Sequence, residues 1–126
     1  MPKNLWGDLA SLEVVRTPKT VLEEQANLLT KATKGVLVGV VEVASYPGKF
    51  RYDLNVVVPS LNNYVYTILS VSHSLDLFPL RLQAERPATD VQIHRDDEFE
   101  DVVEKILSSS AVRSALSRLK SQVQKA

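Results

Sequence analysis

The chain has 126 residues, no cysteine, and 15 basic against 15 acidic side chains, so its formal net charge is zero. This length predicts a single domain that can bury a core without disulfides, and the lack of cysteine excludes thiolate chemistry and cysteine-bound metal. The balanced charge argues against a general nucleic-acid binder, which carries a basic excess. The N-terminal sequence has no apolar signal-peptide core, and the longest apolar run, residues 36–41, is far too short to span a membrane. We therefore expect a soluble cytoplasmic protein.

The first 16 residues predict an N-terminal arm or a short helix. Leu5, Trp6, Leu9 and Leu12 have the spacing of an amphipathic helix, although the residues after Leu12 equally suit an extended lead-in. Trp6 is the only tryptophan, and because a buried tryptophan removes a large apolar area from water, we expect it to anchor this segment to the core. The alternative is that Trp6 faces a protein partner as a binding hot spot.

A helix is predicted over residues 17–34. Thr17 can cap it with its hydroxyl group, and Pro18 suits the first helical position, where an N–H group would have no partner. Gly35 is the expected stop at the C-terminal end. One stripe of this helix carries the residues that we expect to face the core, namely Val21, Leu22, Gln25, Ala26, Leu29 and Ala32.

Residues 36–83 are predicted to form antiparallel strands, with a three-strand meander at their centre. Pro47 and Gly48 fit the two central positions of a type II turn, and Pro59 ends the second strand because it cannot donate a ladder hydrogen bond. The second strand alternates cleanly, which is typical of a strand with one buried face. That face consists of Phe50, Tyr52, Leu54, Val56 and Val58.

The first and third strands of the meander are apolar on both faces. The strands of an antiparallel sheet with one solvent-exposed face should alternate between apolar and polar residues, so this pattern is unexpected. Either the strands are covered on both sides or a partner covers the second face. We expect an interface with a protein partner or a second copy of the chain at Leu37, Val41, Leu69 and Val71.

Further strands are predicted after the meander. Pro79 interrupts the next apolar stretch and favours an edge position or a bulge in a fourth strand. Residues 85–90 have the composition of a loop, and residues 91–94 alternate as a short fifth strand would.

The C-terminal part, residues 96–124, is predicted to form two helices. Asp96 or Asp97 is the expected N-cap of the first, with Glu100 completing a capping box behind Asp97. The whole chain, residues 1–126, therefore predicts one α+β domain. It would contain an antiparallel sheet of four to five strands with a meander core, an N-terminal helix, and two C-terminal helices packed mainly on one face.

Few residues suggest chemistry, and no phosphate-loop, dinucleotide-binding, nucleophile-elbow or zinc-protease motif is present. Candidates for ligand binding at the mouth of a pocket are Tyr52, Tyr64, Tyr66 and His73. We expect His73 to be a hydrogen-bonding residue at a strand end; the alternative is a general base. The acidic run after residue 95 suits the positive end of a helix dipole better than a metal site, and we predict no metal and no cofactor.

These observations favour a non-enzymatic protein-interaction domain that binds a protein partner or forms a homodimer through an apolar sheet face. The alternative is a small-ligand-binding protein or small enzyme with a pocket between sheet and helices. We expect neither nucleic acid nor a membrane as a partner.

Overall fold

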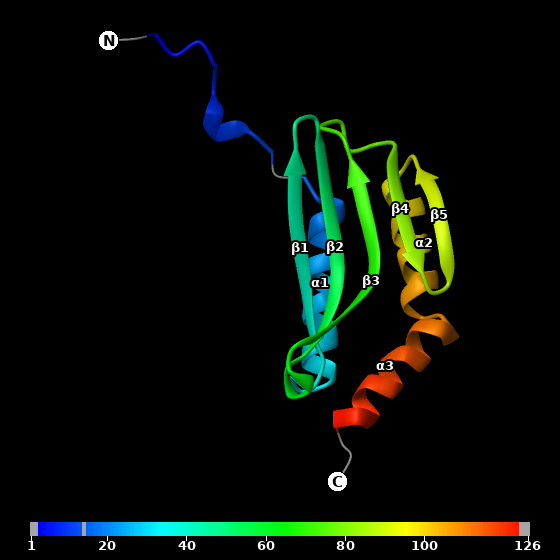
Figure 1. Cartoon of the computed structure of the whole chain (residues 1–126). Coiled ribbons are helices and arrows are strands. Elements are labelled where there is room, and N and C mark those ends of the chain that lie inside the picture. The colour runs from blue at the N-terminus through cyan, green and yellow to red at the C-terminus, as the bar shows by residue number, and fades with distance from the viewer. Residues whose placement is uncertain (1–2, 14, 124–126) are drawn as a thin grey trace.

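The computed structural model describes residues 3–13 and 15–123 and confirms the predicted α+β class (Figure 1). Within these residues, five strands form one open antiparallel sheet in the order β1-β2-β3-β4-β5, so that each strand pairs with the next one in sequence. The described elements are η1 (Leu9–Ser11), α1 (Pro18–Ala32), β1 (Val38–Tyr46), β2 (Lys49–Val58), η2 (Pro59–Leu61), β3 (Tyr64–His73), β4 (Leu80–Glu85), β5 (Ala88–Ile93), α2 (Asp96–Leu107) and α3 (Ser110–Val123).

The α-helices lie on one face of the sheet. In Figure 1, α1 runs behind β1 and β2, α2 runs behind β4 and β5, and α3 crosses the lower end of the layer. The core lies between sheet and helices, because side chains from α1, β2, β3, β4, α2 and α3 form one buried apolar cluster. The opposite face carries no helix in the described part of the chain. The sheet therefore has a covered face and an open face.

The helix α1 begins as the sequence predicts. Thr17 is its N-cap, with the hydroxyl oxygen 3.4 Å from the backbone nitrogen of Thr20, and Pro18 occupies the first turn. The helix ends at Ala32, two residues before the predicted end, because the backbone is already left-handed at Lys34 and at Gly35, with φ of 53° and 81°.

A β-bulge interrupts β3. Leu54 of β2 pairs with Leu69, but the next residue, Asn55, pairs with Thr67, so Ile68 is an extra residue on β3. Ile68 and Leu69 are both buried, although adjacent residues of a regular strand point to opposite faces. The bulge therefore directs two successive side chains into the core.

The bulge changes which residues of β3 share a face. Before it, Tyr66 pairs with Val56, and after it, Val71 pairs with Tyr52, and both of these β2 residues lie on the covered face. Strict alternation placed Tyr66 and Val71 on opposite faces, which is wrong for this strand because of the extra residue between them. The bulge therefore places the apolar residues of β3 on the covered face, except Val65, which pairs with Val57 on the open face.

Two boundaries in the second half of the chain also differ from the prediction. The expected loop over residues 85–90 is mostly strand, because β4 and β5 form a hairpin whose turn is only Arg86 and Pro87. The N-cap of α2 is Arg95 and not an aspartate. The side chain of Glu98 stabilises the start of α2 instead, since its carboxylate accepts a hydrogen bond of 2.8 Å from the backbone N–H of His94.

Among residues 3–13 and 15–123, no helix is both long enough and apolar enough to cross a membrane.

Candidate protein-interaction surface

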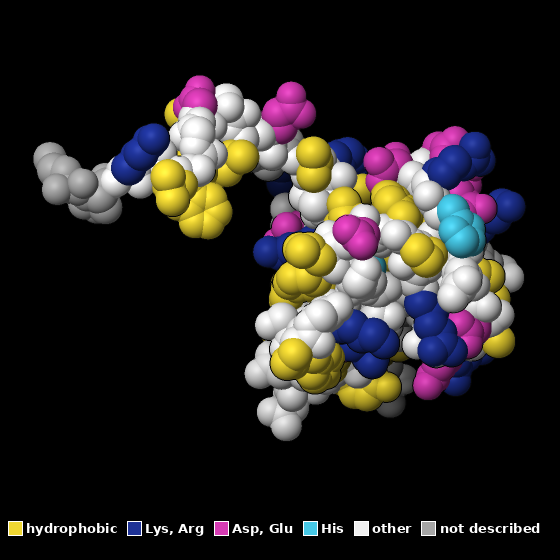
Figure 2. Space-filling model, turned by 90° about the horizontal axis from the view of Figure 1, so that it is seen from above, with side chains coloured by type: hydrophobic (Ala, Val, Ile, Leu, Met, Phe, Trp, Pro, Cys, Tyr) yellow, Lys and Arg dark blue, Asp and Glu magenta, His cyan; other side chains and the backbone are white. Residues whose placement is uncertain are grey.

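The most exposed apolar segment is the N-terminal arm, which we define as residues 3–13 and 15–16. It leaves the upper end of α1 and projects away from the rest of the chain (Figure 1). Leu5, Trp6 and Leu12 are 84%, 81% and 71% exposed, and Leu9 is 48% exposed. Hydrophobic side chains gather mainly along one side of the arm (Figure 2). The expectation that Trp6 anchors the arm to the core is therefore wrong, because Trp6 contacts no core residue and stays in solvent.

Local hydrogen bonds shape the arm. The side chain of Asn4 accepts a hydrogen bond of 2.9 Å from the backbone N–H of Trp6 and donates one of 3.1 Å to the carbonyl of Gly7. Asp8 then caps the short helix η1, accepting a 3.0 Å hydrogen bond from the N–H of Ala10. The arm thus carries a turn and a helix start, but no tertiary packing.

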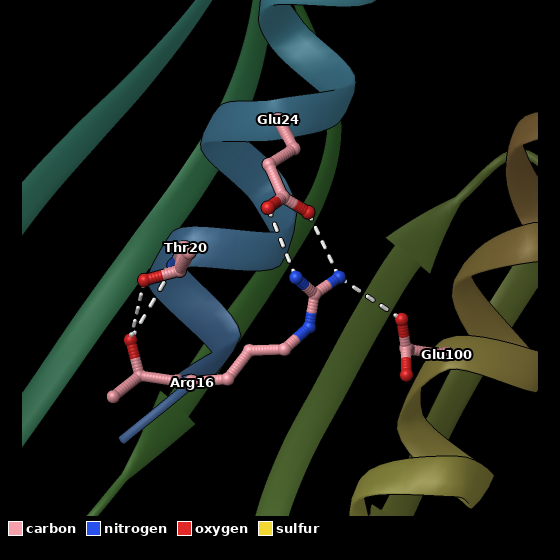
Figure 3. Close-up of polar contacts among 5 residues, drawn as sticks. Arg16, Thr20, Glu24 and Glu100 are labelled. Carbon is pink, nitrogen blue, oxygen red and sulfur yellow. Dashed lines mark hydrogen bonds and ion pairs between the residues drawn. The ribbon is translucent and has the colours of Figure 1, made fainter. Parts of the chain in front are cut away.

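Arg16 fixes the root of the arm between two helices (Figure 3). Its guanidinium group lies 2.8 Å from the carboxylate of Glu24 in α1 and 3.1 Å from that of Glu100 in α2. Hydrogen bonds to Glu24 and then to Glu100 raise the pKa of Arg16, so the side chain keeps its charge. An exposed ion pair shared between α1 and α2 therefore links the residue at the root of the arm to both helices.

An apolar groove of about 260 Å³ lies between α1 and α3 on the helix layer. Leu28 forms part of its rim and is 57% exposed. A second hollow of about 410 Å³ shares Gln25 and Leu107 with this groove, and Glu100, Glu104 and Arg113 supply charge to it. The apolar part is lined by Gln25, Ala26, Leu28, Leu29, Ala32, Leu54, Ile68, Leu107, Val112 and Leu116.

The four residues predicted to form an interface all lie on the covered face. Leu37, Leu69 and Val71 are 1%, 1% and 0% exposed, and Val41 pairs with Leu54 on the side that faces the helices. A partner cannot reach Leu37, Leu69 or Val71 without opening the core, whereas Val41 is only partly buried. The arm and the groove offer accessible apolar side chains instead.

The four predicted ligand-binding residues fall into two separate pairs. The hydroxyl oxygen of Tyr52 lies 3.2 Å from the Nε2 atom of His73, and the ring of Phe50 stacks 5.5 Å from that histidine. The other ring nitrogen of His73 bonds to the carbonyl of Ser74. Both ring nitrogens of His73 thus have hydrogen-bond partners, as a structural role for this residue requires. Burial raises the pKa of Tyr52.

Tyr64 and Tyr66 lie near the opposite end of β3 from His73. Tyr66 and His73 are seven positions apart on β3, which corresponds to about 20 Å along the strand. No single pocket can therefore contain all four predicted residues.

Tyr66 borders a wedge where β3 and β4 diverge. The two strands pair only over Ser70–Ser72 and Arg81–Gln83, which leaves an open wedge of about 630 Å³ beside the first half of β3. The hydroxyl group of Tyr66 is buried without a hydrogen-bond partner in the described part of the chain. Its burial raises the pKa of Tyr66 above the ordinary value of 10.0.

The open face of the sheet is mainly polar. Arg51 pairs with Asp53 at 3.1 Å, and Arg81 pairs with Asp90 at 2.7 Å. An apolar group occupies only the end near the β2–β3 connection, and it consists of Val38, Val40, Val57 and Val65. This face offers less apolar surface than the arm does.

The described residues include no group of three or more metal-ligating side chains. The acidic residues at the start of α2 act locally instead: Asp97 accepts a hydrogen bond of 2.9 Å from the N–H of Glu98, and Glu98 bonds to the backbone of His94. These contacts are those of a helix start.

Comparison with models of known protein families gave no match, and comparisons with curated proteins and with solved structures gave none. The arm and the groove are therefore identified as candidate interaction surfaces by their exposure and apolar lining. The helical spacing of Leu5, Trp6, Leu9 and Leu12 identified the arm in the sequence, whereas the groove has no local sequence signal because two distant helices form it.

Proposed function

We propose that the protein is a non-enzymatic interaction domain that binds another protein through its N-terminal arm. The observation that carries this proposal is the exposure of Trp6, 81%, on the same arm as Leu5 and Leu12, which are 84% and 71% exposed. Tryptophan is enriched in binding hot spots, and contiguous apolar surface on a folded protein usually marks an interaction site. In the free chain the apolar side chains of the arm are exposed to water, and binding to a partner would bury them.

The way in which the arm is attached to the body also suits binding to a partner. Arg16 holds its root against α1 and α2, while the segment beyond has only local hydrogen bonds. Such a segment can change conformation on binding without disturbing the core. The polar open face and the zero net charge support a protein partner over nucleic acid. A chain without cysteine suits a reducing compartment, which supports a cytoplasmic location.

Site-specific photo-crosslinking tests this proposal. A photoreactive residue replaces Trp6 in the full chain, and a matched chain carries it at Leu75, which is equally exposed at 81% in the β3–β4 connection. We expect protein adducts from position 6 that are not formed from position 75 and that decrease when Leu9 is changed to Glu. Identical adducts from both positions would contradict a role for the arm.

A second candidate function is ligand binding in the wedge between β3 and β4. The buried, unpartnered hydroxyl group of Tyr66 supports it, because leaving such a group unpaired costs about 1 to 3 kcal/mol and a ligand acceptor would remove that cost. A fragment screen by NMR should then find ligands that shift resonances of Tyr66 and Thr67. Tyr66→Phe should abolish their binding, whereas Tyr64→Phe, at a residue 53% exposed, should not. Equal binding to both variants would exclude this use of Tyr66.

A further inference from the structure

We propose that the arm of one copy binds the α1–α3 groove of a second copy, and that two chains exchange arms in a symmetric dimer. This inference rests on the proposed function of the arm and names its partner. Each chain carries one apolar arm and one apolar groove, so a two-fold exchange leaves neither of them unfilled.

The arm and the groove match in length. Leu5, Leu9 and Leu12 have i, i+4, i+7 spacing, which is the anchor pattern of a helix that lies in an apolar groove. At 1.5 Å per residue, these anchors span about 10 Å of helix. The groove follows α1 from Gln25 to Ala32, which is the same number of residues and therefore also about 10 Å.

The arm points away from the chain's own groove and leaves that groove open to a second copy. The arm leaves the body on the side of β1 and runs away from it, whereas α3, which forms one wall of the groove, lies toward the opposite side (Figure 1). Arg16 links the root of the arm to Glu24 and Glu100 through exposed ion pairs. The arm beyond that root is free to reach a second chain.

Gly7 gives the proposed docking a specific signature. In the free arm its φ is +76°, a left-handed conformation that suits glycine, and a methyl group added there would meet nothing within 4 Å. A helix through the arm requires a negative φ at this position. Alanine is favoured over glycine in a helix by about 1 kcal/mol, which corresponds to about fivefold in an equilibrium constant. Because each dimer docks two arms, Gly7→Ala should tighten the dimer by up to about 25-fold, about fivefold for each arm.

The mass of the full chain in solution, measured by light scattering over a wide dilution range, tests the exchange. We expect a dimer that dissociates on dilution. Leu5→Glu in the arm and Leu28→Glu on the groove rim should each weaken it by at least about tenfold, since burying a leucine stabilises by more than 1.4 kcal/mol. Leu5 and Leu28 are 84% and 57% exposed, so neither change disturbs the core. Leu75→Glu, at a leucine 81% exposed and outside both surfaces, should leave the dimer intact.

Mixing the two variants identifies the contact. Leu5→Glu keeps a normal groove and Leu28→Glu keeps a normal arm, so the mixture should form a dimer in which one arm occupies one groove. In a helix through the arm Trp6, the only tryptophan, lies about 100° around the axis from Leu5 and about 60° from Leu9, at the rim of the contact, so its emission should shift to the blue on association. Four results would overturn the proposal: a monomer at every concentration, a dimer that survives both variants, no complementation on mixing, or a blue emission that persists on dilution, as closure onto the chain's own groove would give. Crosslinks from position 6 to a different protein only would overturn the exchange but preserve the proposed function.

Discussion

Gly39 of β1 lies directly against Ala26 of α1. A Cβ atom added at Gly39 would be 2.4 Å from the carbonyl oxygen of Ala26 and 2.5 Å from its Cα atom, and both are backbone atoms that can move only with the helix. This contact sets how closely α1 packs on the sheet. We expect Gly39→Ala to lower the free energy of unfolding by about 1 to 3 kcal/mol, because an extra methyl group here forces two elements apart.

Chemical denaturation of Gly39→Ala and Gly35→Ala separates crowding from backbone strain. Gly35 has a φ of +81° but open space around its Cβ position, so its substitution should cost only the left-handed penalty of about 1 to 2 kcal/mol. A Gly39→Ala variant as stable as the wild type would show that α1 does not pack this closely on β1.

Thr30 of α1 covers part of the free edge of β1. Its hydroxyl oxygen accepts a hydrogen bond of 2.9 Å from the backbone N–H of Gly39 and donates one of 3.1 Å to the carbonyl of Ala26. Thr30→Val keeps the shape but leaves this N–H group unpaired, which should cost about 1 to 3 kcal/mol. Hydrogen exchange at the Gly39 amide should become faster in Thr30→Val and remain unchanged in Thr20→Val. Unchanged exchange in both variants would contradict the edge contact.

Tyr52 and His73 form a buried polar pair between β2 and β3. Tyr52→Phe removes the hydroxyl group that lies 3.2 Å from Nε2 of His73 and leaves a buried ring nitrogen without its partner. We expect a loss of about 1 to 3 kcal/mol in the free energy of unfolding. Tyr46→Phe is the matched control, because Tyr46 is 59% exposed and its substitution should stay within about 0.5 kcal/mol of the wild type. Equal stability of the two variants would exclude a structural role for the pair.

The fold class follows from local patterns in this sequence, but the faces of the sheet do not. Thr17 and Pro18 set the start of α1, and Gly48 has the positive φ that its turn requires, because caps and turns depend on a few adjacent residues. The bulge at Ile68 depends on the register between two strands, which no local pattern reveals. The sequence therefore predicts a more apolar second face than the folded chain has, since the open face is apolar only at Val38, Val40, Val57 and Val65.

The candidate site was predictable only in part. The spacing of the apolar residues in the arm is a local property and was visible, but whether Trp6 contacts the core depends on where the chain goes next. Composition alone favours burial for a tryptophan, and this was wrong here because the arm leaves the body at Arg16. The groove joins residues of α1, such as Leu28, to residues of α3, such as Leu116, and so exists only in the folded chain.

Arg81 and Asp90 join β4 to β5 through two parallel hydrogen bonds, of 2.9 Å from Nε and 2.7 Å from the terminal nitrogen. The hydrogen bond from Arg81 holds the pKa of Asp90 below its ordinary value of 3.8 in the folded chain. Because the folded pKa is depressed, the pair stabilises the fold above the unfolded pKa and loses this contribution as the pH falls through the folded pKa. Asp90→Asn should therefore be less stable than the wild type at neutral pH, and the difference should shrink below about pH 4. Urea unfolding of both chains across this range measures it, with Asp101→Asn as a control for the loss of one exposed carboxylate. A difference that is the same at every pH would show that the ion pair does not stabilise the hairpin.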